Sequence, residues 1–185
     1  MCLLADQGYR TGIVDFTRGE LGTRGTPEGR MAEAARAAEI LGLRVRENLG
    51  LPDGDTHSVA QSCLDAETAE DDGTPQAPWR PHHVLHYLQA LDVEPTFVVD
   101  VSSVWERRME ALLAFESQFY QPGSGGDDGP ETYISNPRFL MWVAARARTF
   151  GYRIGADFGE PFVYRHGPVG VDDLVATLRR DKPFR

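Results

Sequence analysis

The sequence predicts an α/β fold whose first half is a parallel sheet. A short apolar run with β-branched residues, 12–16, has the length and composition of a buried strand. Residues 27–41 follow with apolar positions at helical spacing, and residues 44–49 then alternate as a second strand. The order strand, helix, strand is typical of parallel pairing, and 185 residues suit a single domain over 1–185.

Composition excludes several classes of protein. The formal net charge of −9 argues against a general nucleic-acid-binding protein, because no basic block could neutralise a phosphate backbone. Cys2 and Cys63 are too few for a disulfide framework and lack metal-site spacing. The first residues hold no signal peptide, and no stretch approaches the length of a membrane span. We therefore expect a cytoplasmic protein with no membrane partner.

The strand, loop and helix over residues 11–41 form the predicted functional surface. Thr26 is a good N-cap, Pro27 suits the first helical position, and Gly42 suits the helix end. In open α/β sheets, ligands bind at the loops that leave the carboxyl ends of the strands. The loop before Thr26 is such a loop.

Arg30 is the leading candidate residue of this surface. It lies in the first turn of the predicted helix, where the helix dipole disfavours a cation. A guanidinium there suits an anionic ligand that also takes free backbone N–H groups. The alternatives are an ion pair with Glu28 or Glu33, or a solvated side chain.

Glycines recur at every third position of the loop, at Gly19, Gly22 and Gly25. The pattern differs from the dinucleotide fingerprint and from the P-loop, so it does not predict a nucleotide site. A loop that needs positive φ angles accounts for each glycine singly. Arg18, Glu20 and Arg24 put alternating charge in this loop, and they are either site residues or its solvated rim.

Three histidines, His82, His83 and His86, lie in a segment that favours a strand. Alternation places the first and third on one face, and no cysteine or nearby carboxylate completes a metal set. We expect His86 to serve as a hydrogen-bond partner or acid rather than as a ligand. His57 is isolated in the sequence.

The remaining chain predicts a mixture of helices, strands and loops. The first residues, ending at Gly8, have the pattern of the last turn of a helix, an odd start that suggests truncation. The acidic, turn-rich residues 67–78 and the glycine-rich residues 123–129 predict loops. The predicted helices are Ser58–Ala66, Ser103–Tyr120, Asn136 to a cap at Gly151, and Val171–Arg180. Ser103 and Glu106 form the expected capping box of the second of these helices. The predicted strands are Val84–Leu88, Thr96–Val101 and Glu160–Tyr164.

The chain resembles the LmbE/PIG-L-like zinc-dependent deacetylases, and most closely the N-acetylglucosaminyl-malate deacetylases of bacillithiol biosynthesis. Residues 15–30, DFTRGELGTRGTPEGR, look like the second strand and loop of that family. Further matches follow in order along most of the chain: ENLGLPDG at 47–54, His86-Tyr87, FVVDVS at 97–102, ESQFY at 116–120, GEPF at 159–162 and GPVGVDDL at 167–174.

The resemblance implies a Rossmann-like, three-layer parallel-sheet domain, a commonly homo-oligomeric state and hydrolysis of the N-acetyl group of an amino-sugar conjugate. It implies a zinc ion held by two histidines and an aspartate, with a second aspartate as general base. The substrate-side residues that it implies are Arg30, Thr17, Arg18, Glu20, Arg24 and His86.

The chain departs from the family at its metal site. The family's first strand ends in His-Pro-Asp-Asp, and a later loop carries His-Pro-Asp-His, but neither motif occurs here. We therefore expect a chain that lacks the first strand and a central strand and loop of the family, and that does not bind the catalytic metal. The alternative function is a catalytically inactive remnant that keeps the substrate-side pocket or an oligomer interface.

Overall fold

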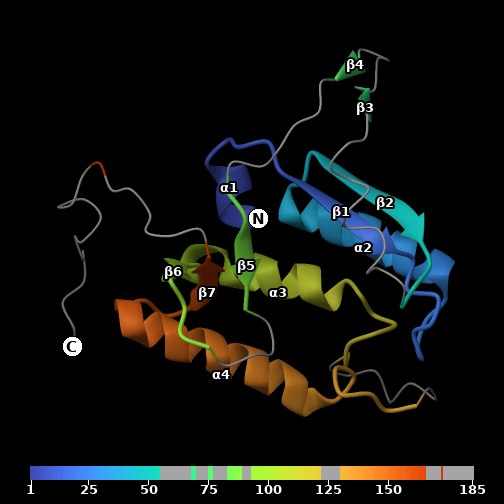
Figure 1. Ribbon diagram of the computed structural model, residues 1–185. Helices are drawn as coiled ribbons and strands as arrows, with labels where there is room; N and C mark the ends of the chain where they lie inside the picture. The colour runs from blue at the N-terminus through green and yellow to red at the C-terminus, as the bar shows by residue number, and fades with distance from the viewer. Residues whose placement is uncertain are drawn as a thin grey trace. The chain divides into compact units, whose positions relative to one another are not determined.

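The structure is a computed structural model, and it describes residues 1–54, 68–69, 75–76, 83–88, 93–121, 130–165 and 172. The chain groups into two compact units (Figure 1). Unit 1 holds Met1–His82 and Arg107–Asn136, and unit 2 holds His83–Glu106 and Pro137–Arg185. The prediction of one domain over 1–185 stays a prediction.

Unit 1 is built on a parallel pair of strands, as predicted. Strand β1, Gly12–Thr17, pairs in parallel with β2, Val45–Leu51, and the register shifts between Asp15 and Thr17. Helix α2, Pro27–Leu41, connects the two strands and lies along them (Figure 1). The α/β fold class is confirmed.

Helix α2 begins and ends at the residues that the sequence predicts. The Thr26 side chain accepts the Gly29 N–H at 3.1 Å, and Pro27 is the first helical residue. At the other end Gly42 adopts the left-handed conformation at φ +71°, which costs glycine nothing. Local capping chemistry therefore sets both ends of this helix.

The two faces of the β1–β2 pair differ in polarity. Asp15 and Arg46 lie on the face toward α2, where Arg46 donates to the carbonyl of Ala34. Apolar side chains occupy the opposite face and are about half exposed: Val14, Phe16, Val45 and Leu49. The ion pair of this sheet thus lies on the helix side, whereas the charged Glu47 shares the opposite, more exposed face with these apolar residues.

A short helix, α1 (Cys2–Asp6), opens the chain, and Gly8 follows it with φ +82°. Its carboxylate Asp6 pairs with Arg107 at 2.8 Å, and Arg107 also donates to the carbonyl of Cys2 at 3.1 Å. These bonds raise the pKa of the Arg107 guanidinium further above its ordinary value. They attach α1 to residue 107.

The predicted helix Ser103–Tyr120 is too long. A 3₁₀ turn, η2 (Ser102–Val104), precedes α3, Trp105–Leu113, and the chain then turns. The expected capping box of Ser103 and Glu106 is also wrong, because the turn begins after Val101 with no side-chain cap and Ser103 lies inside it. Just before the turn, Asp100 accepts the Ser102 N–H at 2.9 Å and its Oγ–H at 2.6 Å. After α3, tertiary hydrogen bonds to Ser117 replace further helical turns.

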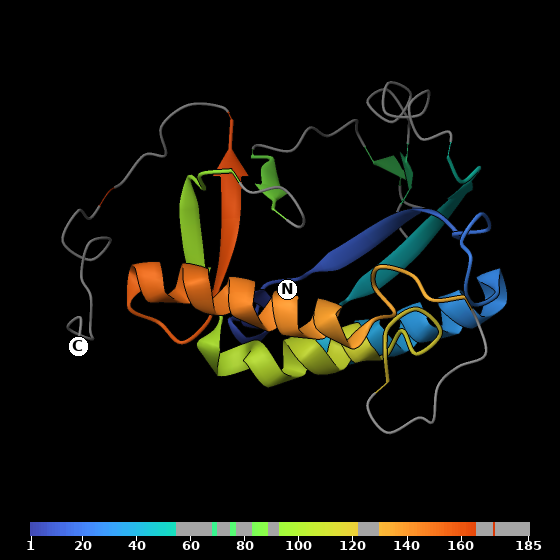
Figure 2. The same cartoon turned by 90° about the horizontal axis from the view of Figure 1, so that it is seen from below.

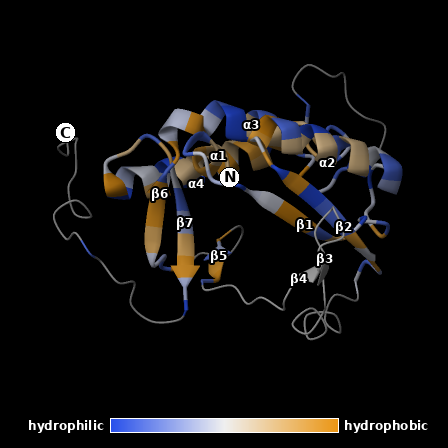
Figure 3. Ribbon diagram, turned by 90° about the horizontal axis from the view of Figure 1, so that it is seen from above, coloured by the Kyte–Doolittle hydropathy of each residue, from blue (hydrophilic) through white to orange (hydrophobic). Residues whose placement is uncertain are grey.

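Unit 2 contains an antiparallel sheet of order β5–β7–β6, with bounds Leu85–Tyr87, Gly159–Tyr164 and Phe97–Asp100. Strand β6 is almost wholly hydrophobic (Figure 3). Helix α4, Pro137–Ile154, packs against β6 and β7 (Figure 2). Aromatic packing adds to this core, where the Trp105 ring stacks on Phe158 with centroids 4.2 Å apart.

Gly151 does not end α4, which continues for three residues to Ile154. An added Cβ at Gly151 would lie 2.8 Å from the carbonyl oxygen of Ala156 and from two backbone atoms of Phe158. The glycine is therefore a point of close backbone approach rather than a cap.

Two short strands, β3 (Thr68–Ala69) and β4 (Pro75–Gln76), pair antiparallel within the region expected to be a loop. The predicted helices Ser58–Ala66 and Val171–Arg180 and the loop 123–129 lie outside the described residues, Asp172 excepted. Among the described helices, none is long and apolar enough to cross a membrane.

Candidate functional site

The candidate site is a cavity of about 400 Å³ in unit 1. It lies at the carboxyl end of β1, against the first half of α2 and the turn at residues 115–118. Its lining combines charged, amide and apolar side chains: Asp15, Thr17, Arg18, Gly19, Arg30, Met31, Ala34, Ala35, Arg46, Glu47, Asn48, Phe115 and Gln118. The position agrees with the ligand-binding edge expected of a parallel sheet.

The guanidinium of Arg30 is bound by backbone carbonyls of the loop. Nη1 donates to the carbonyl of Gly19 at 2.6 Å, and Nε donates to the carbonyl of Arg24 at 3.1 Å. Nη2 donates to the same Arg24 carbonyl. The side chain thus folds the loop around itself, an arrangement different from an ion pair with Glu28 or Glu33 and from a solvated side chain.

This guanidinium also explains the glycine spacing. An added Cβ at Gly19 would lie 2.2 Å from Nη1 of Arg30, and one at Gly22 would lie 2.0 Å from Nη2. An added Cβ at Gly25 would lie 2.4 Å from Oγ of Ser117. Gly19 and Gly25 have positive φ, but Gly22 does not, so a side chain at Gly22 would require the Arg30 guanidinium to shift from its carbonyl partners.

Asp53 fastens the start of the loop to the segment after β2. Its carboxylate accepts the Thr17 hydroxyl at 3.4 Å and the Leu21 N–H at 3.2 Å. In return, the Glu20 carboxylate accepts the Asp53 N–H at 2.8 Å. This backbone donor lowers the pKa of Glu20 below its ordinary value of 4.5, because the hydrogen bond favours the ionised form.

The amide of Asn48 supports the end of β1. Its Nδ2 donates to the carbonyl of Thr17 at 2.7 Å, and its Oδ1 accepts the Gly50 N–H at 2.8 Å. Both polar ends of Asn48 are thereby used within the protein. Asn48 consequently positions Thr17 rather than offering an open group to the cavity.

Three polar side chains of the cavity lining make no hydrogen bond within the part of the chain that the structure describes: Arg18, Gln118 and the exposed Glu47. Arg18 is exposed and lies beside Gly50, and Gln118 is half-buried in the cavity wall. Phe115 and Met31 also line the cavity and supply apolar surface.

Beneath these groups lies an ion pair of Asp15 and Arg46. The Arg46 side chain reaches both carboxylate oxygens, and its Nη1 donates to the carbonyl of Ala34 at 3.1 Å. The same guanidinium lies 5.6 Å from the ring centre of Phe115. Helix, sheet and turn therefore meet at this one side chain.

The sequence-predicted residues divide into three groups. Arg30, Thr17 and Arg18 line the cavity. Arg24 and Glu20 lie outside its lining and hold the loop, since Arg24 donates to the carbonyls of Ser117 and Pro130 and Glu20 binds Asp53. His86 lies in β5 of unit 2 and is not among the lining residues.

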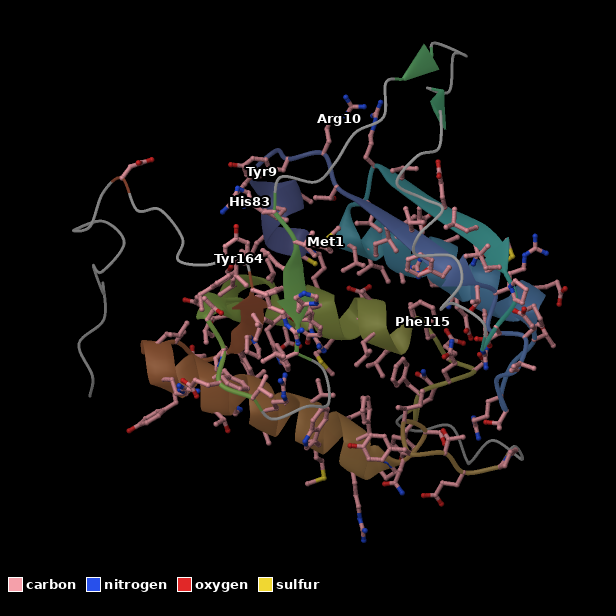
Figure 4. All side chains as sticks on the ribbon, in the orientation of Figure 1. Met1, Tyr9, Arg10, His83, Phe115 and Tyr164 are labelled. Atoms are coloured by element: carbon pink, nitrogen blue, oxygen red, sulfur yellow. The ribbon has the colours of Figure 1, made fainter. Side chains whose placement is uncertain are left out.

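The histidine segment carries one described contact. Nδ1 of His83 lies 3.0 Å from the hydroxyl of Tyr164, and the two side chains lie together in Figure 4. His82 and His57 lie outside the described residues. The roles assigned to the histidines stay predictions.

Several cavity residues were missed at the level of sequence. Asp15 interrupts an apolar strand, and Arg46 and Asn48 share one face of the next strand at a spacing of two. This polar alternation is the signal that could have identified them. Phe115 and Gln118 carried no such signal because they were assigned to a helix.

The described residues contain no group of three or more histidine, cysteine, aspartate or glutamate side chains that could hold a metal ion. Zinc in catalytic sites takes three protein ligands. The residues that the structure describes therefore do not fit the zinc ion that the family resemblance implies.

Several solved structures share this fold, including the three that follow, while no protein-family model matches the sequence. A conserved protein from Thermus thermophilus is 27% identical, with a TM-score of 0.72 over 92% of this chain and 88% of its own. The N,N'-diacetylchitobiose deacetylase from Pyrococcus horikoshii is 17% identical, with a TM-score of 0.62 over 88% of this chain and 75% of its own.

The third structure is the 4-carboxy-2-hydroxymuconate hydratase from Pseudomonas putida. It is 17% identical, with a TM-score of 0.59 over 94% of this chain and 90% of its own. One fold serves both a deacetylase and a hydratase. The reaction must therefore be argued from the site.

Proposed function

We propose that this chain is a deacetylase-type protein whose unit 1 cavity binds an N-acetylated amino-sugar conjugate. The observation that carries the proposal is the lining of that cavity, which combines open polar groups, among them Arg18 and Gln118, with apolar side chains. The family resemblance of the loop sequence and the fold shared with a chitobiose deacetylase support it.

The chemistry of the cavity suits such a ligand. A sugar offers hydroxyl groups and an apolar ring face, and its N-acetyl group adds one amide donor and one acceptor. The Gln118 carboxamide can both donate and accept, and Phe115 offers an aromatic surface. The Arg18 guanidinium suits a carboxylate of the conjugate, such as that of N-acetylglucosaminyl-malate.

Metal-dependent hydrolysis of the N-acetyl group is a different property from binding of the sugar conjugate. In a zinc-dependent deacetylase the metal polarises the amide carbonyl and activates water. Because the described residues do not form a three-ligand group, no hydrolytic step is assigned to them. Hydrolysis and sugar binding are consequently tested separately, and a non-catalytic sugar-binding remnant is the alternative function. From the same resemblance we propose a homo-oligomer, and from the low cysteine content and the pattern of the first residues we propose a cytoplasmic location.

Titration calorimetry with N-acetylglucosaminyl-malate and with N-acetylglucosamine tests the binding. We expect Arg18→Ala to weaken binding of the malate conjugate about tenfold, roughly 1.4 kcal/mol, and to change N-acetylglucosamine binding less. Arg10→Ala is the matched control, since Arg10 is an exposed arginine outside the cavity lining. Failure of the unmodified chain to bind either compound would refute the proposal.

An acetate-release assay with added zinc then separates the two functions. Binding with acetate release would identify an active deacetylase and would contradict the expectation of an incomplete metal site. Binding without release would identify the remnant.

A further inference from the structure

We propose that Glu33 is a positioning residue that sets one wall of the cavity. Glu33 lies outside the lining, and it acts through Ser117, whose neighbours Phe115 and Gln118 do line the cavity. The inference rests on the proposed sugar site for its ligand readout. It adds to that site a residue that the sequence suggested only as an ion-pair partner of Arg30 and to which the comparisons assign no role.

The Glu33 carboxylate is buried, and both of its oxygens accept hydrogen bonds from one residue, Ser117. Glu33 is 8% exposed, and its Oε1 accepts the Ser117 N–H at 2.6 Å while its Oε2 accepts the Ser117 Oγ–H at 2.8 Å. A buried carboxylate needs such donors, and hydrogen bonds to an ionised acceptor are stronger than neutral ones. Residue 117 is thereby held at two points against α2.

These bonds close a ring that begins and ends on α2. The carbonyl of Ser117 accepts Nε of Arg24 at 3.2 Å, and the carbonyl of Arg24 accepts Nε of Arg30 at 3.1 Å. Arg30 and Glu33 are three residues apart, so they lie on one side of the same helix. Each member of the ring therefore constrains the others.

The ring joins the two walls of the cavity. One wall is the loop after β1, which Arg30 folds around its guanidinium. The other is the turn after α3, which Glu33 holds through Ser117. Gly25 touches Ser117 so closely that an added Cβ would lie 2.9 Å from its Cβ, so the walls also meet by contact. Loosening Glu33 should therefore move Phe115 and Gln118 relative to the loop.

Glu33→Gln tests the inference, because it keeps the shape of the side chain while removing its charge and one acceptor. We expect the Kd for N-acetylglucosaminyl-malate to rise about tenfold. Glu39→Gln is the matched control on the same helix, since Glu39 is exposed and should change Kd by less than about twofold. Ser117→Ala keeps the N–H and loses only the hydroxyl, so we expect a smaller rise of about threefold.

Amide hydrogen exchange gives a readout that general destabilisation would not reproduce. Glu33→Gln should speed exchange at Ser117 and at Gly22, whose N–H is bonded to the Gly19 carbonyl inside the loop. The amide of Ala37, in the buried middle of α2, should exchange at its original rate. Equal acceleration at all three amides, or an unchanged Kd in a chain that binds the ligand, would overturn the inference.

The two proposals fail in different ways. If the unmodified chain binds no sugar conjugate, the proposed function is wrong, and the exchange at Gly22 alone decides whether Glu33 positions the loop. If Glu33→Gln does not fold, Ser117→Ala decides both readouts. An unchanged Kd and unchanged Gly22 exchange in Ser117→Ala would then refute the positioning role.

Discussion

Arg46 on β2 holds the carboxylate of Asp15 on β1 at two points, with Nε 2.6 Å from Oδ2 and Nη2 3.0 Å from Oδ1. The Arg46 and Asp15 side chains are only 16% and 29% exposed. A two-point pair of this kind fixes the orientation of both side chains. Since Arg46 also bonds Ala34 and lies over Phe115, the pair fixes the floor of the cavity.

Removal of Arg46 should therefore destabilise unit 1. We expect Arg46→Met to lower the free energy of unfolding by about 2 kcal/mol, because Asp15 loses its partner while staying half-buried. Urea denaturation measures the change. Arg44→Met, at an exposed arginine just before β2, should be close to neutral. The double variant Asp15→Asn/Arg46→Met should recover part of the free energy of unfolding that Arg46→Met loses. If the losses of the two single variants instead add in full in the double variant, Asp15 and Arg46 do not act as a pair.

Gly22 gives a second prediction, because the three atoms nearest to an added Cβ there all belong to the Arg30 guanidinium, which loop carbonyls hold in place. We expect Gly22→Ala to cost about 1–2 kcal/mol of stability. In an Arg30→Ala background the same change should cost almost nothing. Gly19→Ala should stay costly in both backgrounds, since Gly19 has φ +69°. Equal costs for Gly22→Ala with and without Arg30, measured by urea denaturation, would refute the close-approach explanation.

The lowered pKa of Glu20 predicts a pH dependence of the loop. A carboxyl group with a lowered pKa in the folded state contributes its full stabilisation above the ordinary value of 4.5. That contribution is lost as the pH falls through the lower folded-state pKa. We expect the carboxyl carbon of Glu20, followed by NMR, to titrate below 4.5, and a midpoint at or above 4.5 would contradict the Asp53 contact. Glu20→Gln should abolish this part of the pH dependence, since it cannot ionise.

Gly151 provides a test in unit 2. Its added Cβ would meet backbone atoms of Ala156 and Phe158, which cannot move aside like a side-chain end. We expect Gly151→Ala to lower the free energy of unfolding by about 2–3 kcal/mol, despite the better helix propensity of alanine. Thr149→Ala, on the exposed side of the same helix, is the control and should be near neutral. If Gly151→Ala instead raises the free energy of unfolding, Gly151 affects stability only through its low helix propensity, and the close-approach explanation is wrong.

Local chemistry made much of the fold predictable. Strand β1, helix α2 with both of its ends, and strand β2 follow from apolar periodicity, the Thr26 cap and Gly42. These signals act between residues close in the sequence, so one sequence contains them. The same reasoning identified the loop after β1 and Arg30 within it.

Long-range contacts decided the rest. Helix α3 ends at Leu113, and Ser117 in the turn that follows bonds to Glu33, a residue 84 positions away that no local pattern identifies as its partner. Likewise Arg30 binds loop carbonyls rather than a neighbouring glutamate, and the strand residues Asp15 and Arg46 become the cavity floor. The sequence by itself determined the helix, the strands and the loop, because capping and periodicity are local properties. Only the tertiary structure decided which side chains meet, because a buried charge takes whichever donor or acceptor the folded chain brings within reach.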